Sequence, residues 1–133
     1  MLAFVDFETK GLNGGVFEAF SVDENGNEIA SMNVSENDCE NFEIFMEKVL
    51  SKSDIVVFWH SFFPIYLSKF YYEIFCKMKG QFASFLDFYS IFDGLKQPRY
   101  KIDNVTYILT GKNHKGNAKD DCYDLYECFN KTK

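Results

Sequence analysis

Two acidic residues near the start of the chain, Asp6 and Glu8, have the spacing of a metal-binding pair. They belong to the segment Leu2–Glu8, whose apolar residues predict a β-strand. Side chains two residues apart on a strand point to the same face, so the two carboxylates lie near each other. Like charges on a buried face are costly unless a cation or hydrogen bonds compensate. Carboxylate oxygens suit Mg²⁺ or Mn²⁺, and we therefore predict a divalent-cation site.

The alternative is an edge strand whose acidic side chains simply face water, which is where most charged side chains lie. The neighbours favour burial. Ala3, Phe4, Val5 and Phe7 make a nearly continuous apolar run around the two acids. Such a run is typical of a strand that is covered on both faces.

The composition predicts one globular domain spanning residues 1–133, with a core built largely from aromatic rings, since 19% of the residues are Phe, Trp or Tyr. The net charge of −6 argues against a protein that holds nucleic acid mainly by neutralising phosphates. It does not exclude an enzyme whose bound cations reverse the local field.

The N-terminal sequence has neither the basic region nor the cleavage pattern of a signal peptide, and no apolar run approaches the length of about 20 residues that a membrane span needs. We therefore expect a cytoplasmic protein that is not embedded in a membrane. Its four cysteines lack the C-x-x-C spacing of a zinc site, so we interpret them as reduced and mostly packed thiols. They are Cys39, Cys76, Cys122 and Cys128.

The elements that must position the acidic pair follow from hydrophobic periodicity and turn residues. Strands are predicted at residues 2–8, 15–22, 28–34, 54–59 and 82–88, with a hairpin turn at Asn25-Gly26 between the second and the third. Helices are predicted from a cap at Ser35 to Leu50, at 63–79, from a cap at Asp103 to Gly111, and at 117–129, with loops such as 97–100 between elements. This order predicts an α/β fold with a mixed sheet flanked by helices.

A third carboxylate, Asp121, is predicted to join the pair from the last helix. Ala118, Cys122, Leu125 and Phe129 define the apolar stripe of that helix. At 100° per residue, Asp121 borders the stripe, so it can reach the strand that carries the acidic pair. The same geometry places three further acids of this helix on a solvated face. They are Asp120, Asp124 and Glu127.

Several segments resemble the DEDD superfamily of 3′–5′ exonucleases, which have the RNase H-like fold and include proofreading domains and oligoribonuclease-like enzymes. The segment from Phe4 to Thr9 resembles its first motif, an apolar strand that ends in Asp-x-Glu-Thr. The segment from Asn117 to Cys122 resembles its third motif, Asn-Ala-x-x-Asp. Strands at Val56–Ser61 and Leu86–Phe88 and a short helix after Tyr100 are also similar to family elements.

The resemblance implies an RNase H-like mixed five-stranded sheet and two-metal hydrolysis of phosphodiester bonds, with Mg²⁺ or Mn²⁺ as cofactor. In that mechanism Asp6 would bridge both metals, Glu8 would bind one and help to position the attacking water, and Asp121 would bind one. The substrate would be single-stranded or short DNA or RNA, trimmed from the 3′ end. Which of the two nucleic acids is bound stays open, as do the oligomeric state and a possible protein partner.

The chain departs from the family at the second motif. His60-Ser61 stands where the family has His-Asn, and the position of the expected carboxylate falls on Ile65, or on Pro64 if the register slips by one. One of the four metal ligands is therefore missing. Asp54 lies at the far end of the strand, too far away to substitute, whereas Asp87 or Asp93 could approach from the next strand.

The third motif is altered too, because the family's catalytic histidine aligns with Gly116. His114, two residues earlier, is a candidate general base if its loop reaches the site, and otherwise an ordinary loop residue.

Candidates for substrate contact are Thr9, at the end of the first motif, and His60, Phe62 and Phe63 near the second. The two rings could stack on bases of a single strand. Equally, they could fill the core, and His60 could simply support the fold. Basic residues at 96–101 and 112–119 could guide a phosphate backbone or be solvated loops.

Two functional readings remain open. The first is a metal-dependent 3′–5′ exonuclease built on Asp6, Glu8 and Asp121, with His114 as base. The second is an exonuclease-like scaffold that binds nucleic acid or a protein partner without cleavage, and the missing second-motif carboxylate favours it.

Overall fold

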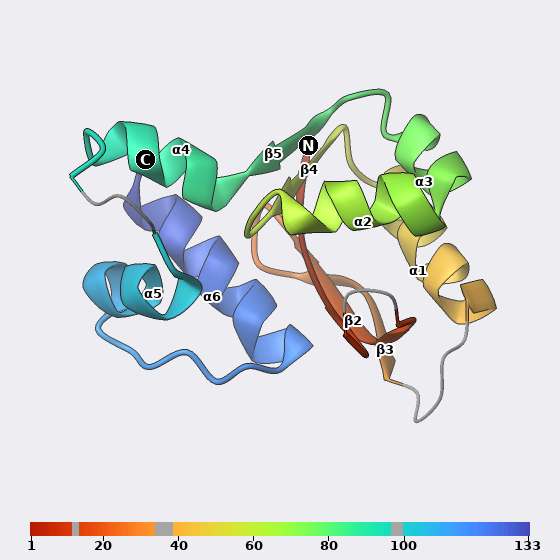
Figure 1. Ribbon diagram of the computed structural model, residues 1–133, viewed down its shortest axis with the longest axis horizontal. Helices are drawn as coiled ribbons and strands as arrows, with labels where there is room; N and C mark the ends of the chain where they lie inside the picture. The colour runs from red at the N-terminus through yellow and green to blue at the C-terminus, as the bar shows by residue number, and fades with distance from the viewer. Residues whose placement is uncertain (12–13, 34–38, 97–99) are drawn as a thin grey trace.

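The computed structural model describes residues 1–11, 14–33, 39–96 and 100–133, and within them a single five-stranded sheet runs in the order β3-β2-β1-β4-β5 (Figure 1). The strands are β1 (Leu2–Thr9), β2 (Val16–Asp23), β3 (Glu28–Asn33), β4 (Ile55–Phe58) and β5 (Phe82–Ser84). β1, β2 and β3 pair antiparallel, whereas β4 runs parallel to β1 and β5 runs parallel to β4. The sheet is therefore mixed, as predicted.

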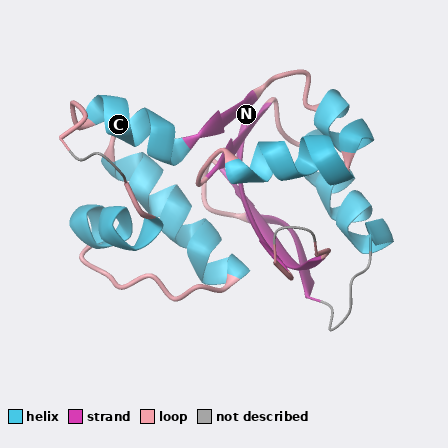
Figure 2. Ribbon diagram, in the orientation of Figure 1, coloured by secondary structure: helices cyan, strands magenta, loops and turns pink. Residues whose placement is uncertain are grey.

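Helices cover both faces of this sheet (Figure 2). They are α1 (Cys39–Ser51), α2 (Phe62–Phe70), α3 (Tyr72–Lys77), α4 (Phe85–Phe92), α5 (Ile102–Thr110) and α6 (Ala118–Lys131). In Figure 1, α1, α2 and α3 lie on one side of the sheet and α5 and α6 lie on the other. This is the α/β architecture that the sequence predicts, and it is consistent with the RNase H-like class.

The strand β1 is central and buried on both faces. On one face the ring of Phe4 packs edge-on against Tyr126 and Phe129 of α6, with centroids 5.5 and 5.1 Å away. On the other face Phe7 packs against Phe42 of α1 and Phe63 of α2, at 5.1 and 4.6 Å. The edge-strand alternative is therefore wrong, and the alternation places Asp6 on the face covered by α6.

The predicted hairpin joins β2 to β3. The Asp23 carboxylate accepts hydrogen bonds from the backbone N–H groups of Asn25 and Asn27, at 2.9 and 3.0 Å. Gly26 has a φ of +83°, which glycine adopts without strain. The turn residues therefore fix the register of β2 and β3.

The segment predicted as one helix at 63–79 is two helices, α2 and α3. The backbone leaves the helical conformation at Tyr71, with φ −137° and ψ 57°. The Tyr71 side chain is buried and packs edge-on against Phe42, with ring centroids 4.8 Å apart. Packing against α1 therefore outweighs the helical periodicity at this point.

The strand predicted at residues 82–88 is also wrong beyond Ser84, where α4 begins. The buried residues Phe85, Leu86 and Tyr89 have the spacing of a helix, not the alternation of a strand. The Leu86 N–H donates to the carbonyl oxygen of Trp59 at 2.9 Å, and this bond ties the first turn of α4 to the residue that follows β4.

The remaining boundaries differ little from the prediction. Asp103 does not cap α5, because the helix begins at Ile102 and Asp103 lies in its first turn. Gly111 ends α5 in the left-handed conformation, as predicted. The cap predicted at Ser35 and most of the loop at 97–100 lie outside the described residues.

Cys76, Cys122 and Cys128 are free thiols, and the last two are buried, as predicted, whereas Cys76 is exposed. The side chain of Cys39 lies outside the described part of the chain. Among the described residues, none of the helices is both long enough and apolar enough to cross a membrane.

Candidate metal centre

Three carboxylates converge between β1 and α6. Oxygen atoms of Asp6, Glu8 and Asp121 all lie within 4.8 Å of one another. Asp6 and Asp121 are only 2% and 4% exposed, and Glu8 is half-buried. The structure therefore brings together the three side chains that the sequence proposed as metal ligands, while cation binding itself stays a prediction.

The N-terminal turn of α6 positions Asp121. Asn117 caps the helix, since its side-chain oxygen accepts from the N–H of Asp120 at 2.8 Å. The N–H of Gly116 donates to Asp121 Oδ1 at 3.0 Å. Gly116 has a φ of +85°, which favours glycine and lets the loop turn its N–H toward the carboxylate. This loop and the helix cap together hold Asp121 toward β1.

The three carboxylates disfavour one another's charge. Burial raises the pKa of Asp6 well above its usual value, and the charges of Asp121 and Glu8 raise it further. Burial also raises the pKa of Glu8, to about 7, in spite of its hydrogen bond with Asp6. Without a cation, this group therefore tends to hold protons near neutral pH.

A divalent cation fits this arrangement. The Oδ2 atom of Asp6 is buried and has no hydrogen-bond partner among the described residues. An orphaned buried carboxylate oxygen is costly unless it is protonated or bound to a cation. Three oxygen donors at this spacing match the ligands that Mg²⁺ and Mn²⁺ take in proteins.

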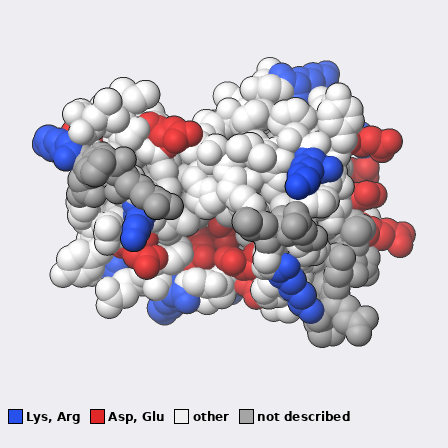
Figure 3. Space-filling model, viewed as in Figure 1, with Lys and Arg blue, Asp and Glu red and all other residues white. Residues whose placement is uncertain are grey.

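Acidic side chains gather in a hollow of the surface between α6 and the first two strands, with basic side chains on both sides of it in this view (Figure 3). The cavity at the three carboxylates has a volume of about 300 Å³. All eight residues predicted for the site line it, together with Phe7, Ile102 and Gly116. The eight are Asp6, Glu8, Thr9, His60, Phe62, Phe63, His114 and Asp121.

The side chain of His114 reaches the site, so His114 is not an ordinary exposed loop residue. Its Nε2 lies 3.0 Å from Asp121 Oδ1, and its side chain is 10% exposed. The ring also stands edge-on to Trp59, with centroids 6.1 Å apart. Burial lowers the pKa of His114, but its contacts with Asp121 and the charge of Asp124 raise it more, so the net shift is upward.

The predicted solvated face of α6 is correct in part. Asp124 is not solvated, because its Oδ2 lies 3.3 Å from His114 Nδ1 and its side chain is 14% exposed. The prediction failed because the loop before α6 folds back over the helix. The other two acids, Asp120 and Glu127, do not line the cavity. Asp120 accepts a hydrogen bond from the Asn117 side chain, and Glu127 pairs with Lys112 at 3.0 Å.

His60 and Phe63 have structural roles. The His60 Nδ1 accepts from the N–H of Phe62 at 3.1 Å, which secures the start of α2, and burial lowers the pKa of the ring. Phe63 is buried, and its ring stacks on Phe58 with centroids 5.8 Å apart. Phe62 is only half-buried and is the aromatic side chain more open to a ligand. Thr9 donates to the carbonyl oxygen of Gly11 at 2.7 Å.

The second motif supplies no carboxylate to the cavity. Ile65 is 62% exposed on the outer side of α2, and Pro64 is buried. Neither Asp87 nor Asp93 lines the cavity, and Asp93 accepts a hydrogen bond from Tyr100 instead. Asp54 lies at the far end of β4, as expected, and pairs there with the N-terminal amine.

Glu18 is a fourth acidic residue beside the site that sequence reasoning missed. It stands opposite Glu8 in the antiparallel pairing of β1 and β2, and its charge contributes to the raised pKa values of Asp6 and Glu8. Its Oε1 accepts a hydrogen bond from the N–H of Ala118, so Glu18 ties the start of α6 to the sheet. The signal was available, because a hairpin pairs residues that are symmetric about its turn.

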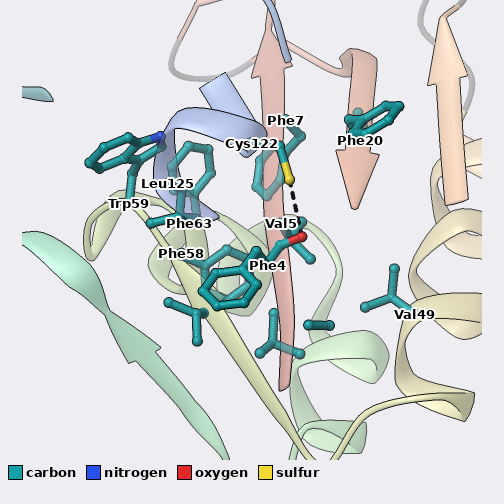
Figure 4. Close-up of a cluster of buried hydrophobic side chains, with 14 of the residues drawn as sticks. Phe4, Val5, Phe7, Phe20, Val49, Phe58, Trp59, Phe63, Cys122 and Leu125 are labelled. Atoms are coloured by element: carbon teal, nitrogen blue, oxygen red, sulfur yellow. Dashed lines mark hydrogen bonds between the residues drawn. The ribbon is translucent and has the colours of Figure 1, made fainter. Parts of the chain in front are cut away.

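A second residue that sequence reasoning did not predict for the site is Trp59. Its indole Nε1 donates to the carbonyl oxygen of Asp121 at 2.8 Å inside the protein. Close to it, Cys122 Sγ donates to the carbonyl oxygen of Phe4, as Figure 4 shows among the buried side chains. These two bonds join the helix that carries Asp121 to β1 and β4.

Comparisons of the chain with protein-family models, with curated proteins and with solved structures found no match. What the chain does must therefore be argued from its own residues and their arrangement.

Proposed function

We propose that this protein is a divalent-cation-dependent 3′–5′ exonuclease that acts on single-stranded or short nucleic acid. The observation that carries the proposal is the convergence of Asp6, Glu8 and Asp121 in one cavity, with a buried Asp6 oxygen that lacks a hydrogen-bond partner. The resemblance of two segments to the first and third DEDD motifs supports the same reading.

Mg²⁺ or Mn²⁺ bound here would supply a Lewis acid for the phosphoryl oxygen and lower the pKa of a bound water. The side chains of Asp6, Glu8 and Asp121 would hold it, and the fold keeps them in place through Trp59 and Gly116. The half-buried ring of Phe62 at the cavity offers an apolar face to a terminal base.

The test combines cation binding with digestion. Mn²⁺ and Mg²⁺ binding is measured by calorimetry, and oligonucleotides labelled at the 3′ or the 5′ end are digested in the same buffer. We expect saturable binding and stepwise shortening from the 3′ end. Asp6→Asn should lose both, whereas the matched control Asp54→Asn, at the far end of β4, should keep both.

Digestion that continues at the wild-type rate in folded Asp6→Asn protein would overturn the proposal, since the activity would then come from elsewhere. So would a wild-type protein that binds the cation but leaves both DNA and RNA oligonucleotides intact.

A second candidate function is binding of nucleic acid or a protein partner without cleavage. The exposed position of Ile65 favours it, because α2 then contributes no carboxylate where the resemblance implies one. Oligonucleotide binding measured by fluorescence anisotropy, in a protein that shows no digestion with either cation, would support this candidate over the first.

A further inference from the structure

The outer face of α4 is apolar and exposed. Three large apolar residues of this helix are exposed at helical spacing, and a fourth follows shortly after the helix ends. They are Phe88, Ile91, Phe92 and Leu95, which together are called the α4 face. The N–H of Leu95 donates to the carbonyl oxygen of Ser90 at 2.8 Å, which holds Leu95 beside the last turn of the helix.

The core does not account for these apolar residues, because α4 has a second apolar side that already packs inward. Phe85, Leu86 and Tyr89 are buried there. A helix that is apolar on both sides is normally covered on both sides. Among the described residues, Ile91 is the most exposed of the large hydrophobic side chains, at 76%. The α4 face therefore calls for a partner.

The size of the α4 face fits a reversible contact. Its four side chains together expose roughly 500 Å², if a fully exposed large apolar side chain is taken as about 200 Å². A patch of this size is at the upper end of what a monomer exposes and is often functional. A standard stable interface buries about 800 Å² on each partner. The α4 face is thus large enough to form the centre of an interface that dissociates at micromolar concentration.

The charges at the two ends of α4 suit a second copy of the same chain. Asp87 lies in the first turn, Lys96 follows the last turn, and both are exposed. Lys96 approaches Asp93 only to 3.9 Å, at the surface, where such a pair contributes little. Figure 3 shows mostly uncharged atoms along α4, with acidic atoms near the end that joins β5 and basic atoms beyond the other end.

An antiparallel arrangement brings these opposite charges together. When two copies of α4 pack antiparallel about a two-fold axis, the acidic end of each helix meets the basic end of the other. A parallel arrangement would place like charges side by side, which is unfavourable. The α4 face is therefore complementary to itself in charge as well as in apolar character.

We infer that the α4 face joins two copies of this chain in a reversible two-fold dimer, with the two α4 helices antiparallel. Ile91 and Phe92 form the centre of the contact, and Asp87 lies near Lys96 of the partner subunit. None of the four residues of the α4 face lines the cavity of the candidate metal centre. The dimer therefore does not depend on the proposed exonuclease.

The first experiment measures the mass of the full chain by analytical ultracentrifugation and light scattering, from micromolar to millimolar protein. We expect a monomer–dimer equilibrium for the wild type. Ile91→Glu buries a charge of each copy at the centre of the contact and should weaken dimerisation by about 100-fold or more. Ile65→Glu changes an isoleucine of α2 that is 62% exposed and is the matched control, which should dimerise like the wild type. Circular dichroism checks that both variants are folded.

The second experiment tests the antiparallel arrangement by exchanging the end charges. Asp87→Lys and Lys96→Asp should each weaken the dimer, because each variant places like charges together at both ends. An equimolar mixture of the two variants should dimerise again, because in the mixed dimer every contact joins a lysine to an aspartate. The double variant should likewise dimerise as the wild type does. This rescue distinguishes a second copy from any other partner.

A wild-type protein that stays monomeric at millimolar concentration would overturn the inference and assign the α4 face to a different protein. The same holds if Ile65→Glu weakens the dimer as much as Ile91→Glu, or if the mixed charge variants associate no better than either one alone. These outcomes are separable from failure of the proposed function. A dimer without digestion would sustain the α4 contact and overturn the exonuclease, whereas Asp6-dependent digestion by a monomer would do the reverse.

Discussion

The indole of Trp59 donates a hydrogen bond of 2.8 Å to the main-chain carbonyl oxygen of Asp121, across 62 residues of sequence. Trp59 follows directly on the last residue of β4, and Asp121 lies in the N-terminal part of α6. The bond is buried, so it competes little with water. It joins the sheet to the helix at Asp121, one of the three carboxylate residues of the candidate metal centre.

Trp59→Phe should therefore loosen the centre without emptying the core. Phe retains an apolar ring against Phe85, but the Asp121 carbonyl loses its side-chain donor and keeps only the N–H that it accepts within the helix, and one such hydrogen bond contributes about 0.5–1.5 kcal/mol. We expect the free energy of unfolding in urea to fall by this amount and Mn²⁺ affinity to fall as well. Unchanged affinity in the destabilised variant would show that the bond supports the fold alone.

Asp6→Asn should stabilise the protein when no cation is present. In the wild type, burial and the charges of Asp121 and Glu8 penalise the ionised Asp6, and the amide removes that charge. The thermal midpoint in EDTA should therefore rise in the variant. In saturating Mn²⁺ the order should reverse, because only the wild type gains the binding free energy of this ion. A variant that is less stable than the wild type in EDTA would contradict the account.

The sequence predicted the centre better than its surroundings, for a physical reason. Asp6, Glu8 and Asp121 sit on regular elements, where the strand and helix periods fix which way a side chain points. His114 and Asp124 meet because the loop before α6 folds back, and an irregular loop has no repeating pattern from which side-chain directions can be predicted. The break at Tyr71 likewise depends on a contact with Phe42 that is 29 positions away in the chain.

Cation affinity should rise as the pH rises through about 7. Burial raises the pKa of Glu8 to about 7, and its proton must leave before the carboxylate binds an ion. Calorimetry at several pH values, in buffers of different ionisation enthalpy, should show proton release that shrinks above this pH. Affinity that is constant from pH 6 to pH 8 would contradict the role of Glu8 as a ligand.

The same shift predicts how stability varies without a cation. Because the pKa of Glu8 is higher in the folded protein than its usual value of 4.5, the folded state binds more protons in the interval up to about 7. The contribution of Glu8 to the free energy of unfolding should therefore decrease as the pH rises through this interval. Glu8→Gln should flatten the dependence in EDTA, and an unaltered slope in that variant would assign the effect to another group.

Glu18 should support the centre through the start of α6. Its carboxylate accepts from the N–H of Ala118, so Glu18→Ala should cost about 1 kcal/mol of stability, as for the loss of a helix cap. Glu18→Gln keeps an acceptor oxygen and removes a charge near Asp6 and Glu8, and it should be at least as stable as the wild type in EDTA. Urea unfolding of both variants checks this, and equal losses in the two would mean that the charge, not the bond, matters.

Phe62 and Phe63 should separate substrate contact from folding. Phe63 is buried among aromatic rings, so Phe63→Ala should cost about 3–5 kcal/mol of stability. Phe62 is half-buried at the same cavity, and Phe62→Ala should cost much less stability but weaken oligonucleotide binding by the loss of one stacked base, about 1–3 kcal/mol. Anisotropy titrations and urea unfolding of the two variants measure both effects. Wild-type oligonucleotide affinity in the Phe62 variant would contradict this role, because it would mean that no base stacks on the Phe62 ring.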